Sequence, residues 1–414
     1  MKVYRYMVLS ALIAFGAIAA VAQGSITPYS KYGYGLLNDN ATSMQRSMGG
    51  VGYAMSNGRQ INVMNPASYA AIDSLTFLWD IGLDVTSLSS KENGKSGSSF
   101  GGGLDYITMQ FPLGKYMGGS LGLMPYSSVG YSFGGDIKNG TDSRLGSGGI
   151  NQLYAGVSGR PFKGFTVGAN FSYLFGTILN DVYATTTSGV QTLFEQVMQI
   201  RDWNVNIGLQ YSHNFSKKHK GTIGLVYTPG KSFLGHTWGT YYEINTDTKV
   251  KPDTIGYTSL KDKYTSAHTF GGGLSYTYDN RLNVEADFTF QNWKNAKFAK
   301  MERFEPTILD NRWKIALGAQ FTPKLRGNYL QRMNYRIGTY YNHDYIMVKG
   351  NNIREYGVSI GFGLPTPSTK TIINLGFEYK RREAYPASLI TENYFNITLG
   401  VNFNELWFWQ NKIK

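Results

Sequence analysis

The chain has no cysteine among its 414 residues. Disulfide bridges, thiolate metal ligands and a lipid-modified N-terminal cysteine are therefore excluded. After residue 21 no stretch approaches 18 consecutive apolar residues, so no later segment is a candidate for a membrane-spanning helix. Charged residues make up only 16% of the chain, and no basic run is interleaved with stacking aromatics. This argues against a nucleic-acid partner despite the formal charge of +13.

The first residues have the pattern of a secretory signal peptide. Lys2 and Arg5 precede an apolar stretch over residues 7–21, and Ala20-Val21-Ala22 supplies small residues for cleavage. We therefore expect residues 1–22 to be removed. A transmembrane anchor is the alternative, but the stretch is short and leads into a segment rich in glycine and asparagine.

Most of the chain after residue 73 consists of runs of about ten residues in which apolar and polar side chains alternate. Residues 282–291, 313–321 and 395–403 are clear examples. Successive strand residues point to opposite faces, so each run gives a strand with one apolar and one polar face. The apolar faces are rich in Trp, Phe and Tyr. Behind a secretion signal, this pattern predicts an all-β fold, a transmembrane antiparallel β-barrel.

The alternation predicts about fourteen strands within residues 74–404, followed by a periplasmic tail over 405–414. We place them near residues 74–87, 101–113, 117–133, 148–158, 165–178, 199–212, 221–235, 262–279, 282–293, 312–323, 333–343, 353–365, 371–380 and 392–404. Short connections, such as 280–281, alternate with longer polar ones, at 88–100, 134–147, 179–198, 236–261 and 294–311. Short periplasmic turns and longer outer loops are typical of outer-membrane barrels, and an even strand count places both ends in the periplasm.

Residues 23–73 do not alternate, and we expect them to form a plug inside the lumen. Their apolar content is too high for a typical disordered tail, which is the other interpretation. Gly49, Gly50 and Gly52 would allow close backbone approach in a crowded lumen. Asn65-Pro66 would turn the chain into the barrel wall.

This plan resembles the FadL-type family of outer-membrane transporters. The resemblance rests on the glycine-rich stretch and on Asn65-Pro66-Ala67, placed ahead of about fourteen strands. It implies passive, cofactor-free uptake of hydrophobic small molecules, such as long-chain fatty acids, across the outer membrane of a Gram-negative bacterium. Ser68 stands where the family commonly has glycine, and the family's substrate-binding loop has no recognisable counterpart, so the substrate class stays open.

Pro125 lies within the third predicted strand, close to Gly122. Proline removes a donor from the ladder and occurs at sheet edges or bulges, so we expect a local break in pairing here. An ordinary bulge is one interpretation. The resemblance implies another, in which Gly122 and Pro125 mark an inward kink that opens a lateral gate to the bilayer.

The polar faces of the predicted strands should line the lumen, with Asn204, Asn206, Gln210, Glu285, Asp287, Arg312, Lys314 and Glu378 among the lining residues. Both signs of charge occur, which favours an ion-paired network around a plug over a charge-selective pore. Catalytic carboxylates at Glu285 and Asp287 are the alternative. None of the five histidines stands beside a nucleophile elbow or forms a metal-binding pair, so we predict no enzyme activity, no metal and no cofactor.

The expected partners are the lipid bilayer with its lipopolysaccharide, a hydrophobic ligand and, in a second hypothesis, other outer-membrane proteins. Basic turns such as residues 217–220 suit anionic headgroups. The second hypothesis is a non-transporting structural or accessory subunit of an assembly or secretion machine. A sealed lumen and a stable partner in a mild-detergent pull-down would favour it, whereas lipid that copurifies inside the barrel would favour transport.

Overall fold

A computed structural model describes residues 27–187, 190–244, 253–261, 264–300, 304, 306–366 and 370–406. The predicted signal peptide, the start of the predicted plug (23–26) and residues 407–414 of the predicted tail lie outside the described residues. Within the described part of the chain, no helix is both long enough and apolar enough to span a bilayer.

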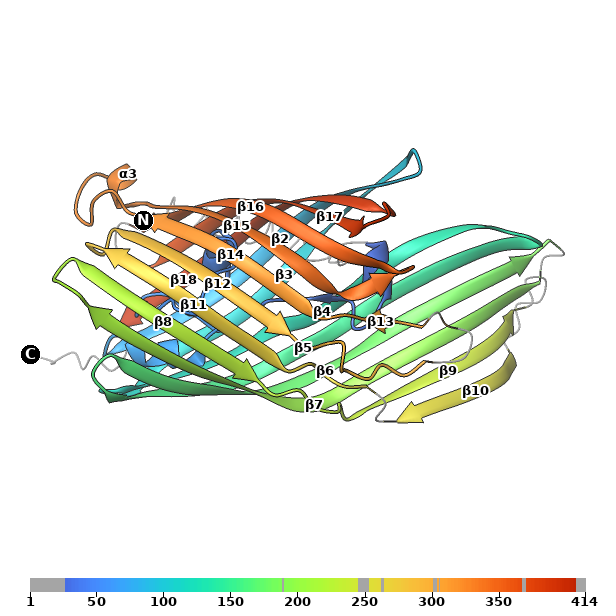
Figure 1. The fold of residues 1–414 in the computed structure, drawn as a ribbon, viewed down its shortest axis with the longest axis horizontal. Coiled ribbons are helices and arrows are strands. Elements are labelled where there is room, and N and C mark those ends of the chain that lie inside the picture. Colours follow the sequence, from blue (N-terminus) through green and yellow to red (C-terminus); the bar gives the residue numbers. More distant parts are fainter. Residues whose placement is uncertain are drawn as a thin grey trace, which may run out of the picture.

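Fourteen antiparallel strands close into a barrel, because the last wall strand pairs with the first along its whole length (Figure 1). The wall consists of β2 (Thr76–Glu92), β3 (Lys95–Gly114), β4 (Met117–Ile137), β5 (Gly140–Phe162), β6 (Phe165–Thr186), β7 (Gln191–Asn214), β8 (His219–Thr228), β11 (Thr269–Tyr278), β12 (Leu282–Gln291), β14 (Arg312–Phe321), β15 (Asn334–Val348), β16 (Asn351–Pro365), β17 (Ile372–Tyr385) and β18 (Thr391–Leu406). Each overlaps one predicted strand, so the predicted fold class and strand number are confirmed.

The remaining elements are short or stand outside this ring. The strands are β1 (Leu36–Leu37), β9 (Gly235–Ile244), β10 (Asp253–Lys261) and β13 (Ile308–Leu309). The helices are η1 (Pro28–Lys31), α2 (Ser43–Arg46), η2 (Pro66–Ala71) and α3 (Tyr329–Arg332).

Three of the predicted long loops are wrong, because residues 88–100, 134–147 and 179–198 are mostly strand. β4 to β7 are 21 to 24 residues long, whereas β8, β11, β12 and β14 have 10 residues each. These stretches are rich in Gly, Ser and Thr, a composition typical of loops, so their strands were not recognised in the sequence. The additional residues, about ten per strand, extend the wall by roughly 30 Å of extended chain.

The fourth long loop, predicted at 236–261, contains the hairpin of β9 and β10. β8 pairs with the C-terminal part of β7, from Ile207 to Asn214. β9 pairs with the N-terminal part of β7, from Gln191 to Ile200. The halves of β4 to β7 that lie toward β9 and β10 form, together with these two strands, an extension on one side of the barrel at the right of Figure 1. This extension is here called the outer wall, and 'above' means toward it.

Apolar side chains cover the outward face of the barrel, and polar ones face the lumen. On β5, for example, Leu153 and Val157 are exposed on the outside, whereas Gln152 and Tyr154 are buried inside. Phe171 and Trp203 stack on the outer surface with ring centroids 6.1 Å apart. An apolar outer band with aromatic rings is the surface that a β-barrel presents to lipid.

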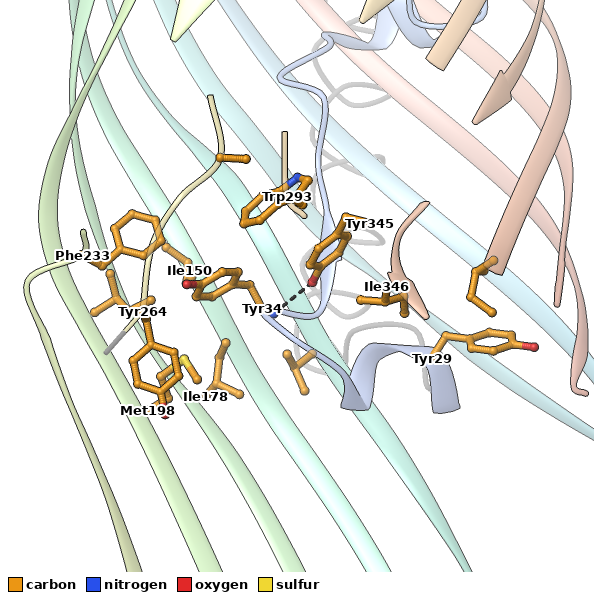
Figure 2. Packing of buried hydrophobic residues seen from close by; sticks show 14 of the residues in the cluster. Tyr29, Tyr34, Ile150, Ile178, Met198, Phe233, Tyr264, Trp293, Tyr345 and Ile346 are labelled. Carbon is orange, nitrogen blue, oxygen red and sulfur yellow. Dashed lines mark hydrogen bonds between the residues drawn. The ribbon is translucent and has the colours of Figure 1, made fainter. Parts of the chain in front are cut away.

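The largest apolar cluster lies inside the lumen and connects opposite sides of the wall. Tyr34 of the N-terminal segment is fully buried at its centre, with edge-on contact to Phe233 at 5.5 Å between ring centroids. Its backbone N–H donates to the Tyr345 hydroxyl at 2.9 Å (Figure 2). The same cluster includes Ile150 of β5 and Ile353 of β16, so packed side chains cross the barrel at this level.

Candidate functional site

Residues 27–73, here called the N-terminal segment, lie in the lumen on a set of inward-facing glycines. A Cβ added at Gly118 would fall on the backbone of Tyr69, and one at Gly224 would fall on that of Tyr53. Gly168, Gly318 and Gly338 contact the segment's backbone in the same way. These glycines provide room for chain to lie directly against the wall.

Two carboxylates of β12 hold the glycine-rich part of this segment. Asp287 accepts hydrogen bonds from the Gly52 and Tyr53 N–H groups at 2.7 and 3.0 Å. Glu285 accepts one from the Ala54 N–H at 2.9 Å. The two carboxylates share a face because they are two residues apart on a strand. They hold backbone rather than forming a free acid–base pair.

Asp39 links the segment to β14 through two cations. It accepts from Arg312 at 2.6 Å and from Lys314 at 2.7 Å. Burial opposes ionisation of this carboxyl, but the two cations outweigh it, so the pKa of Asp39 lies well below its usual range. Asp39 is therefore ionised at any physiological pH.

The predicted motif residues have specific structural roles in the segment. Gly49 and Gly50 adopt positive φ angles of 73° and 79° directly after α2, and the Gly49 N–H donates to the Ser359 hydroxyl at 3.0 Å. Asn65 caps η2 by accepting from the Ala67 N–H at 3.0 Å, and its amide donates to the Tyr53 carbonyl at 2.7 Å. Pro66 begins η2, which lies against β4 to β7, and the wall starts only at Thr76.

The other predicted lumen residues also face inward. Gln210 donates to the Tyr53 and Met55 carbonyls at 3.0 and 3.1 Å. Glu378 accepts from the Tyr340 hydroxyl at 2.9 Å. Asn204 and Asn206 line a small cavity of about 90 Å³. Among the described residues, no group of histidine, aspartate and glutamate is arranged to hold a metal ion.

We expect Asp287→Ala to loosen the N-terminal segment. The substitution leaves two buried N–H groups without an acceptor, and each unsatisfied group costs about 1–3 kcal/mol. Trypsin should then cleave after Arg46, whose guanidinium is paired with Asp105 at 2.8 Å, roughly ten times faster or more. Cleavage after the exposed Arg59 is the internal reference. Asp136→Ala, at an exposed position of the outer wall, is the matched control, and an unchanged rate at Arg46 would contradict the assignment.

The wall ladder is interrupted between β3 and β4. The two strands pair only from Met117 up to Leu123, whose partner is Ile107. Gly122 lies within this paired part, and its Cα faces Thr108. Pro125 lies just above the last pair, next to a register shift between β4 and β5. The predicted break in pairing is thus present at Pro125, whereas the gating role assigned to Gly122 and Pro125 stays a prediction.

The N-terminal segment occupies the β4 side of this opening. β1 pairs with β4, with Leu36 opposite Ser128 and Leu37 opposite Ser127. Above that pair, the Thr27 N–H donates to the Gly130 carbonyl at 2.7 Å. The β3 side of the opening has no such strand within the described residues.

A cavity of about 370 Å³ lies behind the opening and is lined by charged groups of both signs. At the wall it reaches Gly102, Asp105, Pro125 and Ser128. Inside, its charged lining consists of Arg46, Arg312, Lys314, Lys380, Arg382, Asp39, Asp84, Asp344, Glu355 and Glu378. Pockets for apolar ligands are lined mainly by hydrophobic side chains, and this cavity is not.

The chain matches one sequence family along almost its whole length. The BamG family model covers residues 3–414. The chain belongs to the BamG family. No curated protein matches it in sequence.

Solved structures show how the barrel of this BamG-family member relates to known folds. A Pseudomonas aeruginosa FadL homologue superposes with a TM-score of 0.66 at 11% identity, over 89% of this chain and 99% of that one. The Pseudomonas putida toluene transporter TodX gives 0.62 at 15% identity, over 90% and 100%. The CymD monoaromatic hydrocarbon channel gives 0.60 at 13% identity, over 89% and 99%. The FadL-type resemblance is therefore confirmed for the fold. At 11–15% identity, these structures do not identify a substrate for this chain.

The sequence analysis did not predict several residues that line the lumen of this BamG-family barrel. Arg382 pairs with Glu355 at 2.6 Å, and Arg46 pairs with Asp105. Glu355 lies at a position of its predicted strand, residues 353–365, that the alternation places on the lumen face, so the sequence could have identified it. Arg382 lies two residues beyond the predicted end of its strand, and Arg46 is in a segment without periodicity, so neither had one.

Proposed function

We propose that this chain is a structural subunit of a protein assembly in the outer membrane of a Gram-negative bacterium, and that its lumen is not a transport path. One observation carries the proposal: the N-terminal segment occupies the lumen and is held there on several sides. Its backbone lies on the wall glycines, its amides bind Glu285 and Asp287, and Asp39 binds Arg312 and Lys314.

The charge of the cavity argues against a hydrophobic cargo. An apolar molecule placed beside the Arg382–Glu355 and Asp39–Arg312 pairs would displace water from charges and return no hydrogen bonds. A path along the barrel axis would have to separate the packed rings around Tyr34, whose cluster spans the lumen. Both routes are costly for a small apolar molecule.

The location follows from the outward face and the predicted secretion signal. Apolar and aromatic side chains cover the outside of the ring, as lipid contact requires. A secreted barrel of this kind resides in the outer membrane, where its basic turns, such as residues 217–220 at the turn between β7 and β8, would contact anionic headgroups on the periplasmic side.

Uptake of hydrophobic small molecules is the second candidate. The break in the wall at Pro125 favours it, because a cavity lies directly behind that break. Two of the similar structures are named as a toluene transporter and a monoaromatic hydrocarbon channel. In this candidate the N-terminal segment acts as a gate, the lateral opening releases the ligand to the bilayer, and long-chain fatty acids are one possible substrate class.

Two measurements distinguish the candidates. We expect the tagged protein, extracted from its native membrane in mild detergent, to migrate as a complex heavier than the 46.1 kDa chain, with one partner in fixed stoichiometry. In liposomes, the purified barrel should carry neither toluene nor oleate faster than protein-free vesicles. A barrel that purifies alone and carries either compound would establish the second candidate instead. Deletion of residues 24–60 that left such uptake and the single-channel conductance unchanged would exclude gating by the segment.

A further inference from the structure

The two strands that border the opening leave backbone edges unpaired. β3 continues up to Lys95 and β4 up to Ile137, but pairing between them ends at Ile107 and Leu123. Above that point, β2 is the only strand of the described residues that pairs with β3. An unpaired strand edge is a template on which another strand can add.

The turn at the tip of β3 determines which of its groups point into the opening. Asn93 and Gly94 have positive φ angles of 47° and 80° and form a two-residue hairpin turn, so Glu92 and Lys95 are a hydrogen-bonded pair. Hydrogen-bonded and non-bonded pairs alternate along an antiparallel ladder. The backbone groups that face away from β2 are therefore those of Ser96, Ser98 and Phe100.

Residues 96–103 of this edge lack the features that protect natural edge strands, and Lys95 and a register shift near Leu104 lie only at its two ends. Residues 96–103 read Ser-Gly-Ser-Ser-Phe-Gly-Gly-Gly, without a proline or a charge. Edge strands are normally blunted by lysine, proline, bulges or a covering element. An eight-residue edge without them is suited to a partner strand.

Strand addition already occurs on the facing edge of the same opening. β1 adds to β4 as a two-residue antiparallel strand, and the Asn38 N–H extends the contact by donating to the Tyr126 carbonyl at 3.0 Å. β1 thus covers part of the β4 edge, and among the described residues no strand pairs with the facing edge of β3.

The surroundings specify the chemistry of a strand on β3. On the lumen side it would meet the charged cavity at Asp84, Arg46 and Asp105. On the outer side it would lie beside Phe100 and Leu104, which are 67% and 55% exposed. Beside Phe100 and Leu104, a strand with polar residues on its lumen face and apolar residues on its outer face satisfies both sides.

We propose that the β3 edge binds an extended, amphipathic β-strand of a partner membrane protein. The inference rests on the proposed subunit function and names the surface that the partner uses. A second copy of this chain is the competing occupant, and the experiments below separate the two.

The first test measures binding of a strand probe to the purified barrel in detergent. The probe is a fluorescent synthetic peptide with the alternating sequence of residues 395–403, and a peptide of the same composition without alternation is the control. Ser98→Pro removes an N–H that points into the opening and breaks no bond to β2. We expect Ser98→Pro to weaken peptide binding roughly tenfold and Ser98→Ala, which keeps the N–H, to leave it unchanged. Equal affinity for both variants overturns the proposal.

The second test locates the bound strand by cross-linking. Because the chain has no cysteine, a single Ser98→Cys substitution gives a unique thiol. A peptide with a terminal cysteine should form a disulfide with that thiol and not with Val358→Cys, an exposed position on β16, which is paired on both sides. Equal cross-linking at both positions overturns the proposal, as does a Ser98→Cys homodimer in place of a peptide adduct.

The native complex separates failure of this inference from failure of the proposed function. If the complex is lost in Ser98→Pro and kept in Ser98→Ala, the β3 edge is the contact. If both variants keep it, the edge is not the contact and the subunit function stands. If the unmodified chain has no complex, the subunit function fails, and a partner at the edge fails with it.

Discussion

A barrel with Gly224→Val and Gly338→Val is expected to assemble with its N-terminal segment out of place. An added Cβ at Gly224 falls on the Tyr53 carbonyl, and one at Gly338 falls between Met48 and Gly49. Both obstacles are backbone, and both wall strands are paired on each side, so neither partner can move away cheaply. Overpacking costs about 1–3 kcal/mol per site, and two overpacked sites together should prevent the N-terminal segment from lying against the wall. Trypsin should then cleave after Arg46 as fast as after Arg59, and the barrel should conduct ions in planar bilayers.

Gly272→Val is the matched control for this pair. Gly272 faces outward on β11, where an added Cβ would approach nothing closer than Leu225 at 3.5 Å. That variant should retain the closed, protease-resistant state. If the double variant stays as closed and resistant as the control, the wall glycines do not hold the segment. Circular dichroism of both variants shows whether the barrel itself has formed.

The fold was predictable because a barrel wall has a simple period. A wall strand alternates lipid-facing and lumen-facing residues, so runs such as 282–291 identify strands without knowledge of their partners. Prediction failed at 88–100 and 179–198, where strand continues. Beyond the bilayer both faces of a strand contact water, so the apolar half of the pattern is lost there.

The contacts of the N-terminal segment could not be predicted, because they depend on closure of the whole barrel. Arg312 and Lys314 were predictable as lumen residues, but their partner Asp39 is more than 270 positions away and in a segment with no period. The wall glycines that contact the segment were equally hard to predict. Gly272 and Gly273 are adjacent in sequence, yet only Gly273 lies against the segment, at Tyr53 and Ala54.

The opening between β3 and β4 was predictable only in part. Pro125 indicated a break in pairing, because proline has no N–H to contribute to a ladder. The extension of β3 on the opposite side was missed, because Ser96-Gly-Ser-Ser99 has the composition of a loop and the strand was predicted to start at Gly101. Its strand conformation comes from pairing with β2, which the alternation of its own residues does not reveal.

Asp39→Ala is expected to release the part of the segment that covers the β4 edge. The substitution leaves Arg312 and Lys314 buried without their shared carboxylate, and removal of one partner from a buried ion pair costs about 3–5 kcal/mol. Asp39 lies two residues after β1, so its loss also detaches the strand that pairs with Ser127 and Ser128. We expect faster trypsin cleavage after Arg46, and faster labelling of a Leu37→Cys thiol introduced in the same background.

The charge assignment is tested by a compensating variant. If the harm comes from unpaired cations, then Asp39→Ala combined with Arg312→Met and Lys314→Met should restore protection, because a whole buried ion cluster can be replaced by apolar groups with little loss of stability. Asp73→Ala, at an exposed position at the end of the segment, should change nothing. If the triple variant is cleaved and labelled as fast as Asp39→Ala alone, packing and not charge holds this stretch. The segment is then positioned mainly by its contacts with the wall glycines.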